Sequence, residues 1–119
     1  MYGYAIVGGR LGPADLLARD SYELHRQRRD VLSAALVAGG VTPTPPAAAY
    51  EPDRPIVTAA QAQALAAQIE RASAAAYAAV VAGGDTDWRR TGAAWLRDSA
   101  VRGYRWSGEV AALPGLASA

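Results

Sequence analysis

The sequence predicts an all-α protein of four helices, the first of which is short. Two long segments, residues 14–38 and 58–82, contain no proline, are rich in helix-forming residues and are too long for β-strands. The β-branched residues are few and do not alternate with polar residues over a useful length, so no strand is expected. With 119 residues, 51% of them hydrophobic, the chain is large enough to form one domain, residues 1–119, around its own core.

The first two helices are predicted from their ends. Residues 2–11 form the short first helix, in which each of three glycines costs roughly 1 kcal/mol relative to alanine. The second helix, residues 14–38, opens on Pro13, which suits the first turn of a helix, and places Asp15 in that turn. A pair of glycines ends it.

The last two helices also carry terminal signals. Thr58 is the expected N-cap of the helix over residues 58–82, and a second pair of glycines stops it. The fourth helix, residues 86–108, begins after Asp85 or Asp87 as its cap. The glycine-rich connections within each pair of helices are short, so each pair is expected to form an antiparallel hairpin.

The connection between the two hairpins is long and contains five prolines. Residues 40–57 should run extended at about 3.1 Å per residue, a reach of roughly 55 Å. A 25-residue helix is only about 38 Å long, so this crossover can start the third helix parallel to the second. Two hairpins joined by one long crossover form a ferritin-like four-helix bundle. The alternative, two independent hairpins on a flexible linker, is disfavoured because neither hairpin buries its apolar face alone.

Several segments together resemble a known family. They are "YGYAIVGGRL", "HRQRRDVLSAALVAGG", the "P-x-P-P-A-A-A-Y" pattern of the crossover, "AAAYAAVVA" and the final Arg/Trp-rich helix. In order and spacing they resemble an actinobacterial ferritin-like domain family of unassigned function, over almost the whole chain. Members of that family usually continue upstream with most of a first helix that carries acidic and histidine residues. The resemblance therefore implies a ferritin-like bundle whose first helix lacks those groups.

The only histidine, His25, lies on or beside the inward stripe of the second helix. Glu23 points about 160° away from it at 100° per residue, so the two do not hold one ion. A ferritin-like di-iron site needs Glu-x-x-His on two helices, and the residue at that spacing here is Tyr22. The third helix supplies one mid-helix acid, Glu70, and the fourth only Asp98. No di-iron site is expected, and His25 with Glu70 is the fallback pair for a mononuclear metal.

A structural role for these groups is favoured over a metal site. A buried polar group without a partner costs about 1–3 kcal/mol. Four polar side chains can satisfy one another in the middle of the bundle, with Tyr4 and Tyr104 as possible further members. Ser21 lies one turn from His25, but a regular helix offers no oxyanion hole. No catalytic residue and no cofactor is predicted, and the expected buried polar cluster consists of His25, Glu70, Tyr77 and Arg102.

Charge and composition limit the classes of binding partner and the location that we expect for this protein. The net charge is +1, and Arg26, Arg28 and Arg29 spread around their helix among acidic residues, which predicts a solvated, salt-bridged face and no nucleic-acid binding. Trp88 and Trp95 lie one heptad apart, a spacing typical of packing. No segment approaches the ~20 apolar residues of a membrane span. The chain has no cysteine and no basic signal region, so a cytoplasmic protein is expected.

The short first helix suggests an interaction surface. It spans roughly 16 Å of a bundle about 38 Å long, which leaves an apolar groove. The prediction is a non-catalytic interaction or scaffold module that forms a homodimer through this groove, where a small apolar ligand is also conceivable. Two alternatives remain open: a start codon upstream of Met1 that supplies the missing turns, and an iron- or manganese-binding oxidase or storage protein whose ligands are completed in trans.

Overall fold

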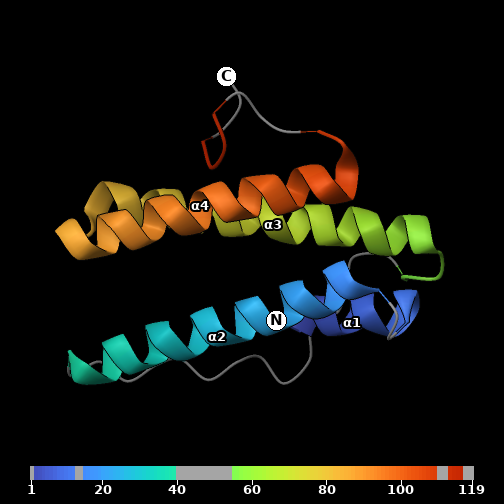
Figure 1. The fold of residues 1–119 in the computed structure, drawn as a ribbon, viewed down its shortest axis with the longest axis horizontal. Coiled ribbons are helices and arrows are strands. Elements are labelled where there is room, and N and C mark those ends of the chain that lie inside the picture. Colours follow the sequence, from blue (N-terminus) through green and yellow to red (C-terminus); the bar gives the residue numbers. More distant parts are fainter. Residues whose placement is uncertain (1, 13–14, 40–54, 110–112, 117–119) are drawn as a thin grey trace. The chain divides into compact units, whose positions relative to one another are not determined.

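A computed structural model describes residues 2–12, 15–39, 55–109 and 113–116. Within these residues it contains four helices, α1 (Tyr2–Leu11), α2 (Leu16–Ala38), α3 (Ala59–Gly83) and α4 (Thr86–Ser107), and no strand (Figure 1). The predicted all-α class of four helices with a short first helix is confirmed. The chain divides into two compact units, Met1–Ala62 and Gln63–Ala119.

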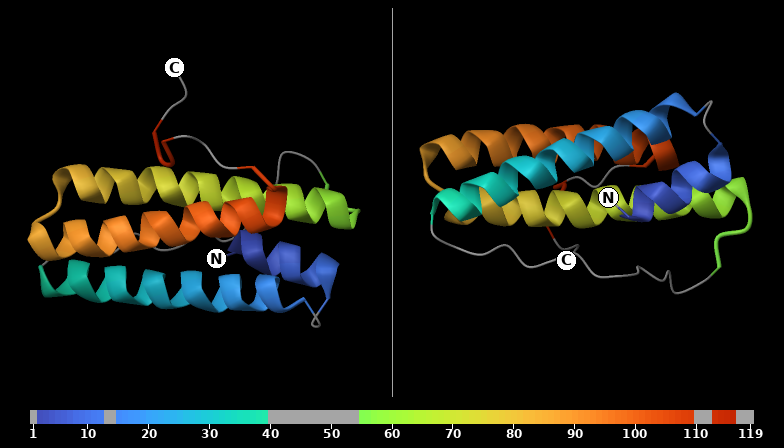
Figure 2. Two further views of the ribbon diagram at one scale, coloured as in Figure 1. Left: turned by 45° about the horizontal axis from the view of Figure 1, so that its top comes forward. Right: turned by 90° about the horizontal axis from the view of Figure 1, so that it is seen from below.

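The first unit is built on the antiparallel pair α1 and α2, which lie side by side in both views of Figure 2. Gly12 ends α1: its N–H donates to the Gly8 carbonyl at 2.8 Å, and its φ of 91° turns the chain toward α2 at little steric cost. Tyr4 and Val7 of α1 and Ala18 of α2 are buried. The burial of these side chains stabilises a helix of only ten residues, which in isolation would be marginal.

The start of α2 differs from the prediction. The helix begins at Leu16 and not at residue 14, and Asp15 is its N-cap and not a first-turn residue. The reason is local: Asp15 has an extended backbone, and its Oδ1 accepts the Ala18 N–H at 2.9 Å. Pro13, on which the earlier start depended, lies outside the described residues. At the other end, the Gly39 N–H donates to the Ala35 carbonyl at 3.1 Å.

Helix α3 starts where Thr58 predicts. The Thr58 Oγ1 accepts the Gln61 N–H at 3.1 Å, and the Gln61 side chain accepts the N–H groups of Thr58 at 3.0 Å and Val57 at 2.8 Å. This reciprocal arrangement is a capping box. Just before it, Arg10 of α1 donates to the Ile56 carbonyl at 3.2 Å. Most of the predicted crossover, residues 40–54, lies outside the part of the chain that the structure describes.

The second unit contains most of α3 and all of α4, which run antiparallel (Figure 2). Asp85, and not Asp87, caps α4, since its Oδ1 accepts the Trp88 N–H at 2.9 Å. Gly92 brings the helices close together: a Cβ there would lie 3.0 Å from Val80 Cγ1 and 3.2 Å from the Tyr77 carbonyl oxygen.

Aromatic rings pack beside this close approach. Trp95 meets Tyr77 edge to face at 5.4 Å and Trp88 at 6.4 Å, with interplanar angles of 66° and 77°. The predicted packing role of Trp88 and Trp95 is confirmed. Among the described residues, no helix is long and apolar enough to cross a membrane.

Candidate functional site

His25 is buried in the first unit, as its place on the inward stripe of α2 predicts. Its ring stacks on Tyr4 of α1, with centroids 5.3 Å apart and 26° between the planes. Glu23, two residues earlier, is directed elsewhere and accepts a hydrogen bond from Arg26 at 2.8 Å. This hydrogen bond is the main cause that lowers the pKa of Glu23 below its ordinary value. The two side chains are therefore separate, as the helical geometry predicts.

The other three members of the expected buried polar cluster belong to the second unit. Glu70 of α3 is fully buried, and Tyr77 is buried beside Trp95. Arg102 forms an ion pair with Asp98 one helical turn away, at 2.9 Å, with 15% and 36% of the two side chains exposed. The two residues are spaced i, i+4 on one helix, so the sequence alone is enough to predict this ion pair. The meeting of His25 with these three residues stays a prediction.

The arginines of α2 do not all lie on one face. Arg26 pairs with Glu23 and Arg29 with Asp30, both at 2.8 Å and with all four side chains about half exposed. Arg28, in contrast, is buried. The prediction of a solvated, salt-bridged face therefore holds for Arg26 and Arg29 and is wrong for Arg28. Arg28 follows His25 by three residues, so it lies on the same, buried face of α2.

Several side chains that could bind a metal have other neighbours in the part of the chain that the structure describes. Over the described ranges, no three residues among His, Cys, Asp and Glu come together so that they could hold a metal ion. The His25 ring packs on an aromatic ring, and Glu23 and Asp98 engage arginines. The fallback pair of His25 and Glu70 comes from different units, and its meeting is a prediction only.

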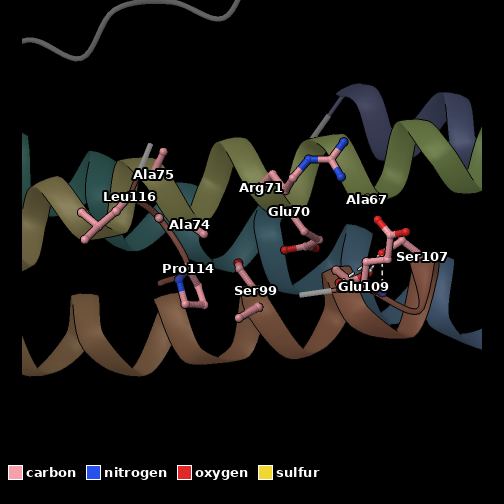
Figure 3. Close-up of a pocket in the computed structure, with 13 residues that line it drawn as sticks. Ala67, Glu70, Arg71, Ala74, Ala75, Ser99, Ser107, Glu109, Pro114 and Leu116 are labelled. Carbon is pink, nitrogen blue, oxygen red and sulfur yellow. Dashed lines mark hydrogen bonds between the residues drawn. The ribbon is translucent and has the colours of Figure 1, made fainter. Parts of the chain in front are cut away.

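The second unit contains a cavity that sequence reasoning did not find. It has a volume of about 520 Å³ and lies between α3, α4 and residues 113–116 (Figure 3). Its walls are made largely by small residues of the two helices: Ala67, Ala74, Ala75, Ala100 and Gly103. Because these side chains are short, the facing helices leave space between them.

Two buried polar side chains face this space. Figure 3 shows Glu70 of α3 and Ser99 of α4 pointing toward one another from opposite walls. Ser99 is only 1% exposed, and its Oγ makes no hydrogen bond within the described part of the chain. Arg71, Ser107 and Glu109 also line the cavity and are exposed, so they mark its rim.

A tight turn forms the remaining wall. Residues 113–116 read Leu-Pro-Gly-Leu, the Leu116 N–H donates to the Leu113 carbonyl at 3.2 Å, and Gly115 has a φ of 85°. Proline followed by a glycine of positive φ is typical of a type II turn. Gly115 packs closely against α3, since a Cβ at this position would lie 2.6 Å from the Ala74 carbonyl oxygen. The Pro-Gly dipeptide signals the turn in the sequence, but nothing local signals its place on α3.

These features define a small all-α protein of two helical hairpins with a partly open cavity beside the second. Residues 1–118 match the family model described as "Domain of unknown function (DUF4439)", and the chain belongs to this family. It is similar to the crystal structure of a conserved hypothetical protein from Mycobacterium tuberculosis, with 37% sequence identity and a TM-score of 0.83. The match covers 90% of this chain and 83% of that one. The search of curated proteins gives no match.

Proposed function

We propose that this chain is a non-catalytic helical interaction or scaffold module that forms a homodimer through the last two turns of α2. The observation that supports this most is the exposure of large aliphatic side chains there. Val31, Leu36 and Val37 are 49%, 43% and 63% exposed. Apart from Ser33, residues 31–38 are apolar. A helical segment that is apolar around most of its circumference is normally buried, so exposed aliphatic groups of this size indicate a surface that another molecule covers.

The lengths of the two helices in the first unit explain why this end of α2 lacks a neighbour within its hairpin. The ten residues of α1 span about 15 Å and the 23 residues of α2 about 35 Å. Tyr4, near the start of α1, stacks on His25 of α2. This end of α1 therefore lies close to the level of His25 along α2. The α2 residues from Val31 onward therefore extend beyond α1.

A second copy of the chain fits this surface better than a charged partner. Residues 31–38, VLSAALVA, carry no charge. Two copies related by a twofold axis would therefore meet without like-charge repulsion, as an isologous interface requires. A partner selected by opposite charge would find nothing to pair with on this segment.

Size-exclusion chromatography with light scattering tests the proposal. The unaltered chain should have the mass of a dimer, and Val37→Asp should give a monomer because it buries a charge in the interface. Val101→Asp is the matched control, since Val101 is a 51% exposed valine on α4, outside the proposed surface. A monomer that persists at high concentration would contradict the proposal. So would stoichiometric iron or manganese that is lost on His25→Ala, which would favour a metal-dependent oxidase or storage protein.

Three wider assignments belong to the same proposal. A relation to ferritin-like proteins is supported by the order of two helical hairpins separated in the sequence by a proline-rich segment. An actinobacterial origin of the family is supported by the similar structure from Mycobacterium tuberculosis. A cytoplasmic location agrees with a sequence that contains no cysteine and hence no disulfide.

A further inference from the structure

The cavity of the second unit has the size and composition of a small-molecule site. Ligand sites in proteins typically enclose about 300–1,000 Å³, with mostly apolar walls and a few placed polar groups. The volume of about 520 Å³ lies within that range. The apolar walls come from alanine, glycine, Pro114 and Leu116, and the polar groups of the interior are Ser99 and Glu70.

Ser99 is the feature that points to a ligand with a hydrogen-bonding group. A serine in a helix often bonds to a carbonyl of the preceding turn. The Ser99 Oγ makes no such bond and reaches no other acceptor or donor in the residues that the structure describes, although it is 1% exposed. Burying a hydroxyl in this way is unfavourable, and a polar atom of a bound molecule would remove the cost.

The walls also limit the charge of the occupant. The fully buried Glu70 carboxyl lines the cavity and offers no positive charge that would bind an anion. The alanine methyl groups and the glycines of the walls offer no side-chain groups that would solvate a charge. A bound molecule that is mostly apolar would therefore fit the walls formed by α3, α4 and the Leu113–Leu116 turn.

We propose that this cavity binds a small neutral molecule with an apolar body of one or two rings and one hydrogen-bonding group, which Ser99 recognises. Gly103 of α4 and Gly115 of the turn lie in the walls of the cavity, so their amide NMR signals report whether a molecule is bound there. The site is independent of the α2 surface proposed for the dimer, because all of its residues belong to Gln63–Ala119.

Two probes of the same shape separate the hydroxyl contact from simple apolar filling. These are 2-naphthol, which carries a hydroxyl, and 2-methylnaphthalene, which carries a methyl group in its place. In amide NMR titrations of the full chain, 2-naphthol should give saturable shifts at Ser99, Gly103 and Gly115. Ser99→Ala should weaken 2-naphthol binding about fivefold and leave 2-methylnaphthalene nearly unchanged. Equal effects on the two probes would contradict recognition by Ser99.

Ser99→Ala has a second readout that does not depend on any ligand. If the buried hydroxyl is unsatisfied, the alanine variant should unfold at the same temperature as the parent or at a higher one. A structural hydrogen bond from Ser99 would instead make the variant less stable, and this result would overturn the proposal.

A filling variant tests the cavity itself. Ala100 is part of the α4 wall of the cavity, opposite α3. The larger side chain of Ala100→Leu should fill the space and so abolish the NMR shifts caused by both probes. Ala94→Leu is the matched control, an exposed alanine of the same helix outside the cavity, and should bind as the parent does. The absence of saturable shifts at Gly103 and Gly115 up to about 1 mM probe, or shifts that survive Ala100→Leu in a folded variant, would overturn the site.

Discussion

Tyr4 of α1 and His25 of α2 stack with their ring centroids 5.3 Å apart and their planes 26° from parallel. Tyr4 is 1% exposed and His25 9%, so both rings are removed from water. Because α1 has only ten residues, few other side chains can attach it to α2. The stacked pair is therefore central to the stability of the first hairpin.

Tyr4→Ala should lower the free energy of unfolding by about 3–5 kcal/mol, the usual cost of deleting a buried aromatic ring. Tyr4→Phe keeps the ring over His25 and should cost only about 1 kcal/mol. Urea denaturation followed by circular dichroism measures both. If the two substitutions are equally costly, the phenolic hydroxyl and not the ring stack is what stabilises α1.

Gly92→Ala should destabilise the second hairpin by about 1 kcal/mol, even though alanine is the better helix former. The added methyl would lie 3.0 Å from Val80 Cγ1 and 3.2 Å from the Tyr77 carbonyl oxygen. The Tyr77 oxygen belongs to the backbone of α3, which cannot shift without moving the helix. Gly83→Ala is the control, since a Cβ there meets nothing within 4 Å and should be neutral or stabilising. Thermal unfolding compares the two. A gain in stability for Gly92→Ala would mean that α3 and α4 are not held at this close distance.

Local chemistry explains which helix ends were predictable. Thr58 and Asp85 cap α3 and α4 through contacts with N–H groups three residues ahead, an interaction that sequence spacing reveals. The same chemistry at Asp15 was obscured by Pro13, because proline also marks a helix start and favours an earlier one. The contact of Asp15 with the Ala18 N–H decides the boundary, and composition alone does not.

The candidate site was less predictable because it depends on which helix faces meet. The inward position of His25 follows from helical periodicity, and the structure finds it buried. The cavity does not follow from periodicity. It requires that small residues of α3 and α4 face each other and that Gly115 lies against the Ala74 carbonyl. Both are contacts between residues far apart in the sequence. Alanine-rich stretches look alike in sequence whether they pack tightly or enclose space.

Asp85→Ala should lower the stability of the second hairpin by about 1 kcal/mol, because the Trp88 N–H loses its acceptor at the start of α4. For a chain of this size the melting temperature should fall by about 3–6 °C. Asp87→Ala is the matched control: it removes a first-turn carboxylate that is not the cap, and should cost only a few tenths of a kcal/mol. Equal shifts for the two variants would show that charge at the helix terminus matters and that the capping hydrogen bond does not.

The pKa of Glu23 should rise toward its ordinary value in the Arg26→Ala variant, since the Arg26 hydrogen bond is the largest cause that lowers it. A folded-state pKa below the unfolded one stabilises the protein above the unfolded pKa, and this contribution disappears as the pH falls through the folded pKa. Carboxyl NMR titration of Glu23 measures the midpoint directly, and added salt should shift it upward as well.

Arg10→Ala serves as the control for this titration, because Arg10 donates to the Ile56 carbonyl and is not among the groups that shift the pKa of Glu23. It should leave the Glu23 midpoint where it is in the parent chain. The exposed position of both partners means that the midpoint, and not the overall stability, is the sensitive quantity. A Glu23 midpoint that does not move in Arg26→Ala would show that this ion pair is not populated in solution.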